Sequence, residues 1–486
     1  MDALVRGWEV VIGLEVHAQV ATLTKLFSSS PTAFGAEPNT QVSFYDAAMP
    51  GMLPVLNGCA VDQAIRTGIG INGQINRISR FDRKNYFYPD LPAGYQISQL
   101  YNPIVTGGYV EIQLQDGAMR TINIERIHIE QDAGKSVHDL SPDNSYVDLN
   151  RAGIPLMEIV SKPDMRSSYE AMHYVKKLRT ILRYIGTCDG NMEQGNLRAD
   201  ANISIRRPGA ALGNRVEIKN LNSIKFIGQA LDYEIERQIE VTENGERVSQ
   251  ETRLFDSNIG ETRLMRSKED AEDYRYFPEP DLKPVFLSND RIARIMDDMP
   301  ELPDARRLRF MNEYKLSLSD TNVLVEDRMV ADRFEMAVRA SKHGAEKSAK
   351  YIANWIIGDL FAYLNREGRS IDETGFPIEY IAELVDLILD STISGKIAKT
   401  VFAEMTENGA APRDVVKKLG LTQISDEGPI ITAIETVLAT NTEQLEKYRA
   451  GRTQLFGFFV GMVMKELQGK GKPELVNKLL REKLGY

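Results

Sequence analysis

The stretch from Arg126 to Lys135, RIHIEQDAGK, alternates apolar and polar side chains. A β-strand places successive side chains on opposite faces, so the two isoleucines face one side while His128, Glu130 and Asp132 face the other. The pattern predicts a strand with one apolar face and one face that carries ligand-binding groups.

Three further stretches repeat this alternation: Val10 to Gln19, Leu197 to Arg206 and Val216 to Lys219. Their polar faces carry Glu15, His17, Gln19, Arg198, Asp200, Asn202, Ser204, Glu217 and Lys219. Four such strands predict a single sheet, packed on helices with its apolar side and open to a ligand on its polar side.

Two interpretations of the polar face compete. Alternating charged residues are typical of the solvated side of a half-buried sheet. An ordinary solvated face favours Lys, Glu and Thr, however, whereas these strands carry His, Asp, Asn and Arg, which are mediocre strand formers. We therefore favour a site, and its carboxylates and imidazoles suit a hard divalent cation such as Mg²⁺.

The composition limits the class of protein. A chain of 486 residues exceeds one hydrophobic core, which predicts roughly two to four domains. The net charge of -10 argues against indiscriminate nucleic-acid binding but leaves room for a local basic patch. Two distant cysteines, no signal-peptide pattern and no apolar run long enough for a bilayer predict a cytoplasmic protein with no membrane segment.

The segment from Asp82 to Gln99, DRKNYFYPDLPAGYQISQ, places Arg83, Lys84 and Tyr86 among further aromatics and prolines. A proline-stiffened loop of this kind suits a phosphate and a planar group, or the end of a nucleic acid. An aromatic loop that simply packs onto the sheet remains the alternative. The sequence Gly134-Lys135-Ser136 is no phosphate loop, because Ile129 stands where a Walker motif needs glycine.

Glu158 lies between Met157 and Ile159, an environment in which a carboxylate needs a partner or a metal. Two helices follow. Ser167 and Glu170 form a capping-box pattern at the start of the first, which ends at Gly186, and the second spans about Ser223 to Val241. These helices are expected to cover the apolar face of the sheet.

The proline-rich segment from Asp273 to Pro284 is expected to end the first domain, and only helices are expected beyond it. The expected helices are Asp290 to Asp297, Asp320 to Lys342, Lys347 to Arg366, Ile378 to Leu389 and Gly395 to Glu407. From Gly409 onward the chain holds 12 Lys and Arg against 9 Asp and Glu, which contrasts with its acidic remainder.

Several long motifs together resemble the B subunits of the tRNA-dependent amidotransferases, the GatB family of GatCAB complexes. The matching stretches are GLEVHAQVATLTKLFSS, DRKNYFYPDLPAGYQISQ, RIHIEQDAGK, LNRAGIPLMEIVSKPDMRS, EIKNLNS, QETR, DYRYFPEPDL, ISGKIAK and FFVGMVMK. They span nearly the whole chain.

The resemblance implies an α+β fold: a mainly antiparallel-sheet cradle domain over residues 1–295, an all-α helical domain over 296–408 and a small YqeY-like, tRNA-binding tail over 409–486. It implies that ATP activates the side-chain carboxylate of Glu-tRNA(Gln) or Asp-tRNA(Asn), and that ammonia then amidates the acyl phosphate. A glutamine-hydrolysing partner, GatA, would supply this ammonia through a channel, and small GatC would join the two.

The same resemblance suggests roles for individual residues. Glu15, His17, Glu130 and Glu158 would be the Mg²⁺ groups of a catalytic site that also includes Lys84. ATP would be bound by Arg83, Lys84, Tyr86, Asp200, Asn202 and Lys219. His17 as a plain structural hydrogen-bonding group is the alternative to its metal role.

Two departures from the family pattern matter. Many relatives carry a glutamate where this chain has Gln131, and some carry a cysteine pair near residues 41–47, where Ser43 and Asp46 stand here, so no zinc is expected. A tRNA-binding scaffold with a structural cation, or a stand-alone metal-dependent hydrolase, are the competing functions.

Overall fold

The computed structural model describes all residues except 1–3, 139, 142, 268–272, 422–425 and 486. The chain divides into two compact units, Met1–Leu302 and Pro303–Tyr486. The first combines a large sheet with helices and the second is helical, which confirms the α+β class predicted from the sequence.

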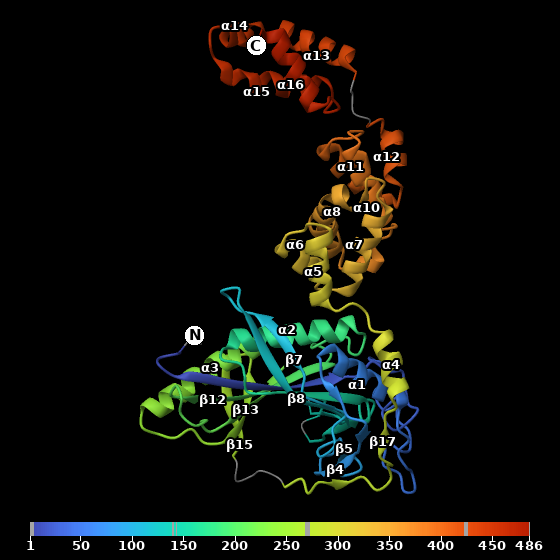
Figure 1. The fold of residues 1–486 in the computed structure, drawn as a ribbon, viewed down its shortest axis with the longest axis vertical. Helices are drawn as coiled ribbons and strands as arrows, with labels where there is room; N and C mark the ends of the chain where they lie inside the picture. Colours follow the sequence, from blue (N-terminus) through green and yellow to red (C-terminus); the bar gives the residue numbers. More distant parts are fainter. Residues whose placement is uncertain (1–3, 139, 142, 268–272, 422–425, 486) are drawn as a thin grey trace. The chain divides into compact units, whose positions relative to one another are not determined.

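A large, mainly antiparallel sheet forms the centre of the first unit (Figure 1). Its strands follow the order β15-β14-β13-β12-β1-β11-β8-β6-β2, and β7 also pairs with β8. In that order their bounds are Glu261–Ser267, Glu251–Asp256, Val216–Leu221, Leu197–Arg206, Glu9–Gln19, Pro155–Ser161, Met119–Gln131, Val105–Thr106 and Gln74–Ile75, and β7 spans Tyr109–Gln113. All four strands predicted from alternation are therefore in one sheet.

The strand β11 is the central element of the sheet that the sequence pattern does not identify. It lies between β1 and β8, which would otherwise be neighbours. Met157 and Ile159 are buried on one face, whereas Glu158 lies on the other. Because β11 is covered on both faces, it reads as an apolar run without clear alternation.

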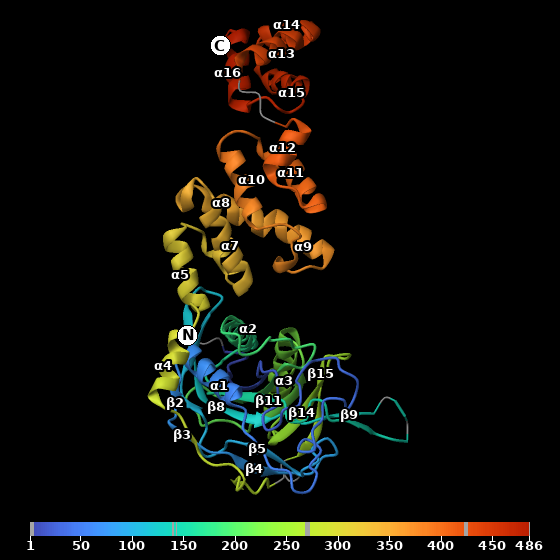
Figure 2. The same cartoon turned by 90° about the vertical axis from the view of Figure 1, so that its right-hand side faces the viewer.

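Three helices cover the apolar face of the sheet, α1 (Gly58–Gly70), α2 (Ser168–Tyr184) and α3 (Ile224–Glu243) (Figures 1 and 2). The side chain of Ser167 accepts a hydrogen bond from the backbone N–H of Glu170, as the capping pattern predicts. Ser223 caps α3 in the same way. Their apolar stripes pack on the isoleucines, leucines and valines of the sheet in one continuous core.

A smaller sheet lies across the opposite face and consists of β16 (Phe277–Pro278), β4 (Asp82–Asn85) and β5 (Tyr95–Ser98). The segment predicted as a loop from Asp82 to Gln99 is thus a hairpin, in which Arg83 and Lys84 lie on a strand. The segment from Asp273 to Pro284 folds back into the first unit, because its β16 pairs with β4.

Short elements complete this unit. They are the pair β9 (Lys135–Val137) and β10 (Tyr146–Asp148), the pair β3 (Ile78–Ser79) and β17 (Val285–Phe286), and α4 (Asn289–Asp297), which packs on α1. The irregular segment after β1 is fixed from within by a buried ion pair, in which Lys25 Nζ lies 3.3 Å from Asp46 Oδ2.

The second unit is helical throughout its described residues. Its α-helices are α5 (Pro303–Glu313), α6 (Leu318–Leu324), α7 (Arg328–Ala340), α8 (Gly344–Trp355), α9 (Phe361–Glu367), α10 (Glu379–Leu389), α11 (Gly395–Asn408), α12 (Pro412–Leu419), α13 (Glu427–Thr440), α14 (Thr442–Arg449), α15 (Phe456–Glu466) and α16 (Pro473–Leu484).

Two of the predicted helices need correction. The helix predicted over Asp320 to Lys342 is broken, since Asp327 leaves helical geometry and caps the start of α7. The helix predicted over Lys347 to Arg366 contains a π-helical turn, Ile356–Leu360, between α8 and α9. Periodicity alone detects neither a cap inside an apolar pattern nor a change of helical pitch.

The second unit contains two apolar clusters. The first extends from Phe310 through Val415 and Val416 of α12, with Leu421 packed against it. The other begins at Ile430 and consists of residues from α13 onward. The apolar packing therefore changes after Leu421, about one helix beyond the Gly409 boundary that the sequence suggests. Among the described residues, no helix has the length and apolar character needed to cross a membrane.

Candidate functional site

The strand register brings the polar groups of four strands into rows. His128 on β8 stands opposite Glu158 on β11, which stands opposite His17 on β1. His17 in turn pairs with Arg198 on β12. Directly opposed residues of antiparallel strands lie about 5 Å apart, so residues far apart in sequence become immediate neighbours.

A second row crosses the sheet beside the first. Glu15 stands opposite Asp200, and Asn202 donates a hydrogen bond to Glu15 Oε1 at 2.9 Å. Lys219 Nζ reaches Asp200 Oδ2 at 2.8 Å and Glu217 Oε1 at 2.9 Å. This row places the predicted groups Asp200, Asn202 and Lys219 on the same face as Glu15.

Two histidines and two carboxylates form the centre of this face. His128 Nε2 lies 3.2 Å from Glu158 Oε2 and 3.4 Å from Glu130 Oε2. His17 Nε2 lies 3.4 Å from the same Glu158 oxygen. Ser98 on β5 also donates a hydrogen bond to Glu130 Oε2, at 3.0 Å. Glu158 therefore has the partners that its apolar sequence context requires.

A cavity of about 380 Å³ opens over this face. The smaller sheet and the segment that follows β15 contribute Lys84, Ser98, Tyr274 and Tyr276 to its walls. From the large sheet and its edge, the lining residues include Glu15, His17, Arg126, His128, Glu130, Glu158, Asp200, Asn202, Arg215, Glu217, Lys219, Glu251 and Thr252. The polar face is thus a partly enclosed site and not an ordinary solvated surface.

Neighbouring charges set the pKa values at the centre. Burial opposes the charged form of His128, but Glu158 and Glu130 outweigh it and raise its pKa to about 9. Burial likewise disfavours the charged form of Glu158, yet His128 and His17 hold its pKa well below the ordinary value. The pKa of Glu130 is lowered as well, since His128 outweighs burial. Both carboxylates therefore remain ionised.

Glu15 behaves differently. Burial raises its pKa, and the negative charges of Glu158 and Glu217 add to this rise. On the facing wall, burial opposes the charge of Lys84, but Glu130 outweighs burial, so the pKa of Lys84 stays above its ordinary value. The cavity thus combines an acidic floor with a charged lysine.

The structure separates Arg83 from Lys84, which the sequence pattern groups together. Successive side chains of β4 point to opposite faces, so Arg83 lies away from the cavity lining. It donates to Glu279 at 2.7 and 2.9 Å and stacks over the ring of Tyr95. These contacts tie β4 to β5 and to the residue that follows β16, and they involve the guanidinium predicted to bind a phosphate.

Tyr86 is also absent from the lining residues. Its ring centroid lies 5.8 Å from Lys84 Nζ, and its hydroxyl donates to Gln96. Asp132, on the predicted polar face, forms an ion pair with Arg198 at 2.9 Å and accepts a hydrogen bond from Gln19 at 3.0 Å. These side chains support the site from its edges and do not line it.

The sequence assigns no role to several residues that line the cavity, among them His128, Tyr274 and Tyr276. His128 was placed on the polar face by its spacing but received no role, although its register opposite Glu158 makes it central. Tyr274 and Tyr276 lie in the segment interpreted as a domain end. Their alternate spacing and the matching stretch DYRYFPEPDL are the signals that could identify them, since nothing local shows that this segment returns to β4.

The two departures from the family pattern are both structural. Gln131 accepts a hydrogen bond from the backbone N–H of Ile97 through its side chain, which joins β5 to β8. Near residues 41–47, the buried Asp46 accepts hydrogen bonds from Ser28 and from the backbone N–H of Ser43 in addition to its ion pair with Lys25.

The donor atoms at the centre fit a divalent cation. His17, Glu130 and Glu158 offer ligand atoms that all lie within 4.8 Å of one another. Two carboxylates and one imidazole suit a first-row divalent ion or Mg²⁺ that retains water ligands. Glu15, which the sequence adds to this set, stands outside the group and beside Asn202.

Comparison with known proteins agrees with this architecture. The family model described as the GatB/GatE catalytic domain matches residues 10–293, and that described as the GatB domain, GatB_Yqey, matches residues 332–484. The B subunit of the aspartyl/glutamyl-tRNA(Asn/Gln) amidotransferase of Granulibacter bethesdensis is 57% identical over 479 residues, which cover 99% of this chain and 98% of that protein.

Proteins with the same name from Acidiphilium cryptum and Rickettsia bellii are 55% and 54% identical. These alignments cover 99% and 98% of this chain, and 97% and 98% of the respective relatives. The chain belongs to the family of the aspartyl/glutamyl-tRNA(Asn/Gln) amidotransferase B subunits.

Proposed function

We propose that this chain catalyses the ATP-dependent amidation of a misacylated tRNA, Glu-tRNA(Gln) or Asp-tRNA(Asn). The carrying observation is the buried cluster of His17, His128, Glu130 and Glu158 beneath a cavity that also holds Lys84. Such an arrangement suits charge neutralisation and alignment, which are the main tasks in phosphoryl transfer.

The proposed reaction has two steps. The side-chain carboxylate of the aminoacyl group attacks the γ-phosphorus of ATP, and ADP leaves. Ammonia then attacks the resulting acyl phosphate, inorganic phosphate leaves, and a proton is released from the nitrogen. Neither step needs a covalent bond to the protein, because the carboxylate and the ammonia are themselves the nucleophiles.

The residues of the cavity have distinct roles in this proposal. Lys84 binds phosphate oxygens, whereas Lys219 is held by Asp200 and Glu217 and positions the opposite wall. His128 fixes the carboxylates of Glu130 and Glu158 from beneath. Mg²⁺ held by His17, Glu130 and Glu158 would neutralise phosphate charge when bound.

We further infer a division of labour within the complex and along the chain. An amidase subunit of the GatA type would release ammonia from glutamine, with a small GatC-type subunit joining the two in the cytoplasm. Residues 1–295 would form the cradle with the catalytic site, 296–408 the helical domain and 409–486 the tail that grips the tRNA body. The excess of Lys and Arg beyond Gly409 supports the last assignment.

The test uses the assembled complex with ammonium as nitrogen source. Glu130→Gln is expected to lower formation of ADP and of amidated tRNA together by about 100-fold, because the site loses a charge that compensates the transition state. The partner's glutamine hydrolysis should be retained, and Mn²⁺ binding followed by electron paramagnetic resonance should weaken.

Amidation near the wild-type rate in Glu130→Gln would refute the proposed site. ADP formation and amidation that both stay unchanged in this variant would instead favour the scaffold function, in which a partner carries out the chemistry. For the tail, removal of the residues after Leu421 should weaken tRNA binding and flatten its salt dependence, while glutamine hydrolysis continues. Unchanged tRNA affinity and salt dependence would exclude that role.

A further inference from the structure

One arginine of the cavity has no role in the reaction proposed above. Arg126 lies on β8, two residues before His128, and is among the lining residues of the cavity of about 380 Å³. Carboxylates line the same cavity, yet the Arg126 side chain forms no hydrogen bond or ion pair with any residue that the structure describes. Its charge is therefore not used by the fold.

A β-bulge aims this side chain at the cavity. In a regular strand Arg126 would share the face of Ile124, which is buried in the core. The ladder with β11 shifts at this point, because Val160 stands opposite Arg126 and the next residue, Ser161, stands opposite Ile124. The extra residue on β8 turns Arg126 to the cavity face and returns Ile127 to the core. Bulges are common beside active sites, where they re-aim a side chain.

The neighbours of Arg126 in the sheet explain why it is unpaired. Its cross-strand partners are Val160 on β11 and Thr106 on β6, and neither carries a charge. The next residue of β8 on the cavity face is His128, an imidazole that supplies no negative charge either. The adjacent positions of the sheet thus provide no counterion for the guanidinium.

The outer end of the guanidinium is the part that a ligand can reach. Arg126 Nε is sealed from solvent without an acceptor, so packing holds it and no ligand contacts it. The terminal nitrogens Nη1 and Nη2 have no partner among the described residues either, but neither of them is sealed. Because the side chain rises from the floor of the cavity, these accessible nitrogens face its interior. Together they form the planar pair of donors that binds a phosphate through two parallel hydrogen bonds.

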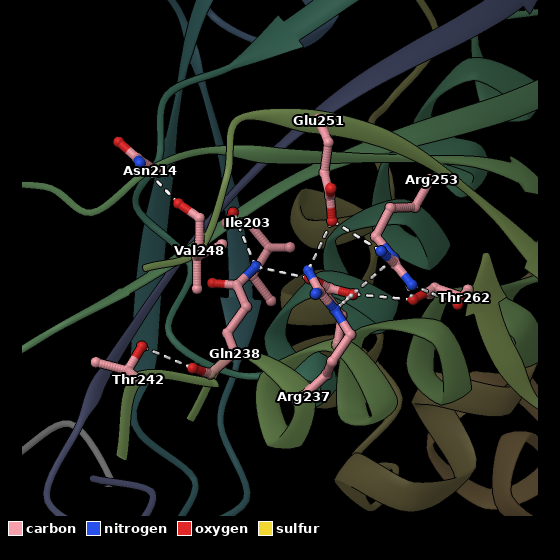
Figure 3. A network of polar contacts seen from close by, with 10 residues as sticks. Ile203, Asn214, Arg237, Gln238, Thr242, Val248, Glu251, Arg253 and Thr262 are labelled. Atoms are coloured by element: carbon pink, nitrogen blue, oxygen red, sulfur yellow. Dashed lines mark hydrogen bonds and ion pairs between the residues drawn. The ribbon is translucent and has the colours of Figure 1, made fainter. Parts of the chain in front are cut away.

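Other arginines near this cavity are used differently. Arg237 and Arg253 both pair with Glu251, at 3.1 and 2.7 Å, and Figure 3 shows the two guanidinium groups on either side of that carboxylate. Glu251 lines the cavity, whereas the two arginines do not. They compensate a charge of the wall, while Arg126 keeps its own charge for an anionic ligand.

The place of Arg126 indicates which anion it meets. In the proposed function, on which this assignment rests, the γ-phosphate of ATP lies beside Lys84 and the buried histidine and carboxylate cluster. Arg126 is two strand residues from His128, which corresponds to roughly 7 Å along β8. The next phosphate of the nucleotide is the anionic group that this distance brings within reach.

We propose that Arg126 is a further catalytic residue, which binds the β-phosphate of ATP through Nη1 and Nη2. When the γ-phosphoryl group passes to the substrate carboxylate, its bond to the bridging oxygen breaks and the electron pair stays on ADP. Arg126 compensates this developing charge, which is a role that arginines have in other phosphoryl-transfer enzymes.

The first test measures ADP formation by the assembled complex, with ammonium as nitrogen source and saturating misacylated tRNA. Arg126→Gln is expected to lower the maximal rate about 100-fold, because the leaving group loses its counter-charge. Arg126→Lys keeps the charge without the planar pair of donors, so its rate should lie between those of the wild type and Arg126→Gln. Arg120→Gln is the matched control, since Arg120 lies on the same strand outside the cavity lining and pairs with Glu170, and its rate should be unchanged.

Nucleotide binding without tRNA separates a phosphate contact from a general structural effect. Calorimetric titration of the assembled complex with the β,γ-imido analogue of ATP should show at least about tenfold weaker binding in Arg126→Gln, because hydrogen bonds to a charged group are lost. Binding of AMP, which has no β-phosphate, should be unchanged. The KM for misacylated tRNA should stay within a few-fold of the wild-type value.

ADP formation near the wild-type rate in Arg126→Gln would overturn the assignment, and so would equal losses of affinity for AMP and for the imido analogue. A raised KM for tRNA with unchanged nucleotide affinity would also overturn it, because the guanidinium would then contact a phosphate of the tRNA. The proposed reaction itself is tested by Glu130→Gln, so its failure and the failure of the role of Arg126 are distinguishable.

Discussion

Two buried charge clusters, one in each unit, show how differently the same residue types are used. In the helical unit, the carboxylate of Glu335 pairs with Arg309 at 2.7 Å and accepts a hydrogen bond from the hydroxyl of Tyr314 at 3.0 Å. Arg306 forms ion pairs with both Glu335 and Asp332. In the sheet unit, Glu158 and Glu130 share histidines at 3.2 to 3.4 Å. The first cluster is closed by dedicated cations, whereas the second keeps its charges available.

The pKa shifts express this difference. Burial opposes the charge of Glu335, but Arg309 and Arg306 outweigh it and lower its pKa to about 2. Burial and two neighbouring carboxylates instead raise the pKa of Glu15. A charged Glu335 therefore stabilises the fold, while a charged Glu15 is maintained at a cost, as expected of a functional group. This contrast makes opposite predictions for the same chemical change.

The largest effect on stability is expected for Glu335→Gln. The amide removes the anion that pairs with both Arg306 and Arg309 and leaves the buried Arg306 with Asp332 alone, which should lower the unfolding free energy of the second unit by about 3 kcal/mol. Urea unfolding followed by Trp355, which lies in that unit's core, measures this in a Trp8→Phe background. Amidation below the unfolding transition should be unchanged, and loss of activity without loss of stability would contradict the structural role.

Glu15→Gln is expected to act in the opposite direction. The amide can still accept the hydrogen bond from Asn202 but removes repulsion with Glu158 and Glu217, so stability should rise by roughly 1 kcal/mol. Amidation should fall about 100-fold, because the cavity loses a charge. Unfolding and amidation assays on the same preparation test the expected gain in stability and the expected loss of activity. A variant that is less stable and fully active would reverse the comparison between the clusters.

The neighbours Arg83 and Lys84 repeat the contrast within one strand. Lys84→Gln should slow ADP formation by roughly tenfold or more, because Lys84 lines the cavity. Arg83→Gln should retain the chemical step within a few-fold but lower stability by about 2 kcal/mol, since the buried Glu279 loses its partner. Equal losses of ATP affinity in both variants would restore the phosphate role for Arg83.

The sequence predicts the features of this site that depend on neighbouring residues, but not those that depend on contacts between distant strands. Alternation identifies the polar faces of β1, β8 and β12, because side-chain direction is a local property. It gives neither the register that sets His128 beside Glu158 nor the insertion of β11 between β1 and β8. Both are set by long-range pairing and by burial on two faces.

A second limit of local information is seen at Arg83, where residue type suggests phosphate binding. Its partner Glu279 is 196 positions away along the chain, so no local pattern reveals that the guanidinium is already occupied. The closed cluster around Glu335 is likewise made by helices α5 and α7, whose separate apolar patterns give no sign of it. Free and paired charges look the same in a sequence.

Acid should expose the closed cluster and distinguish it from the open one. The pKa of Glu335 is lowered in the fold from 4.5 to about 2, so its pairing contributes fully above pH 4.5 and is lost as the pH falls toward 2. Within that window the wild-type second unit should lose stability relative to Glu335→Gln by up to about 1.4 kcal/mol per pH unit. Other carboxylates titrate in both proteins, so the difference in stability between them isolates Glu335.

Urea unfolding followed by Trp355 at several pH values measures this difference, with Trp8→Phe as the common background. Parallel curves for the two proteins between pH 4.5 and 2 would show that Glu335 is not held ionised by its arginines, and the distinction between a closed and an open cluster would then rest on geometry alone.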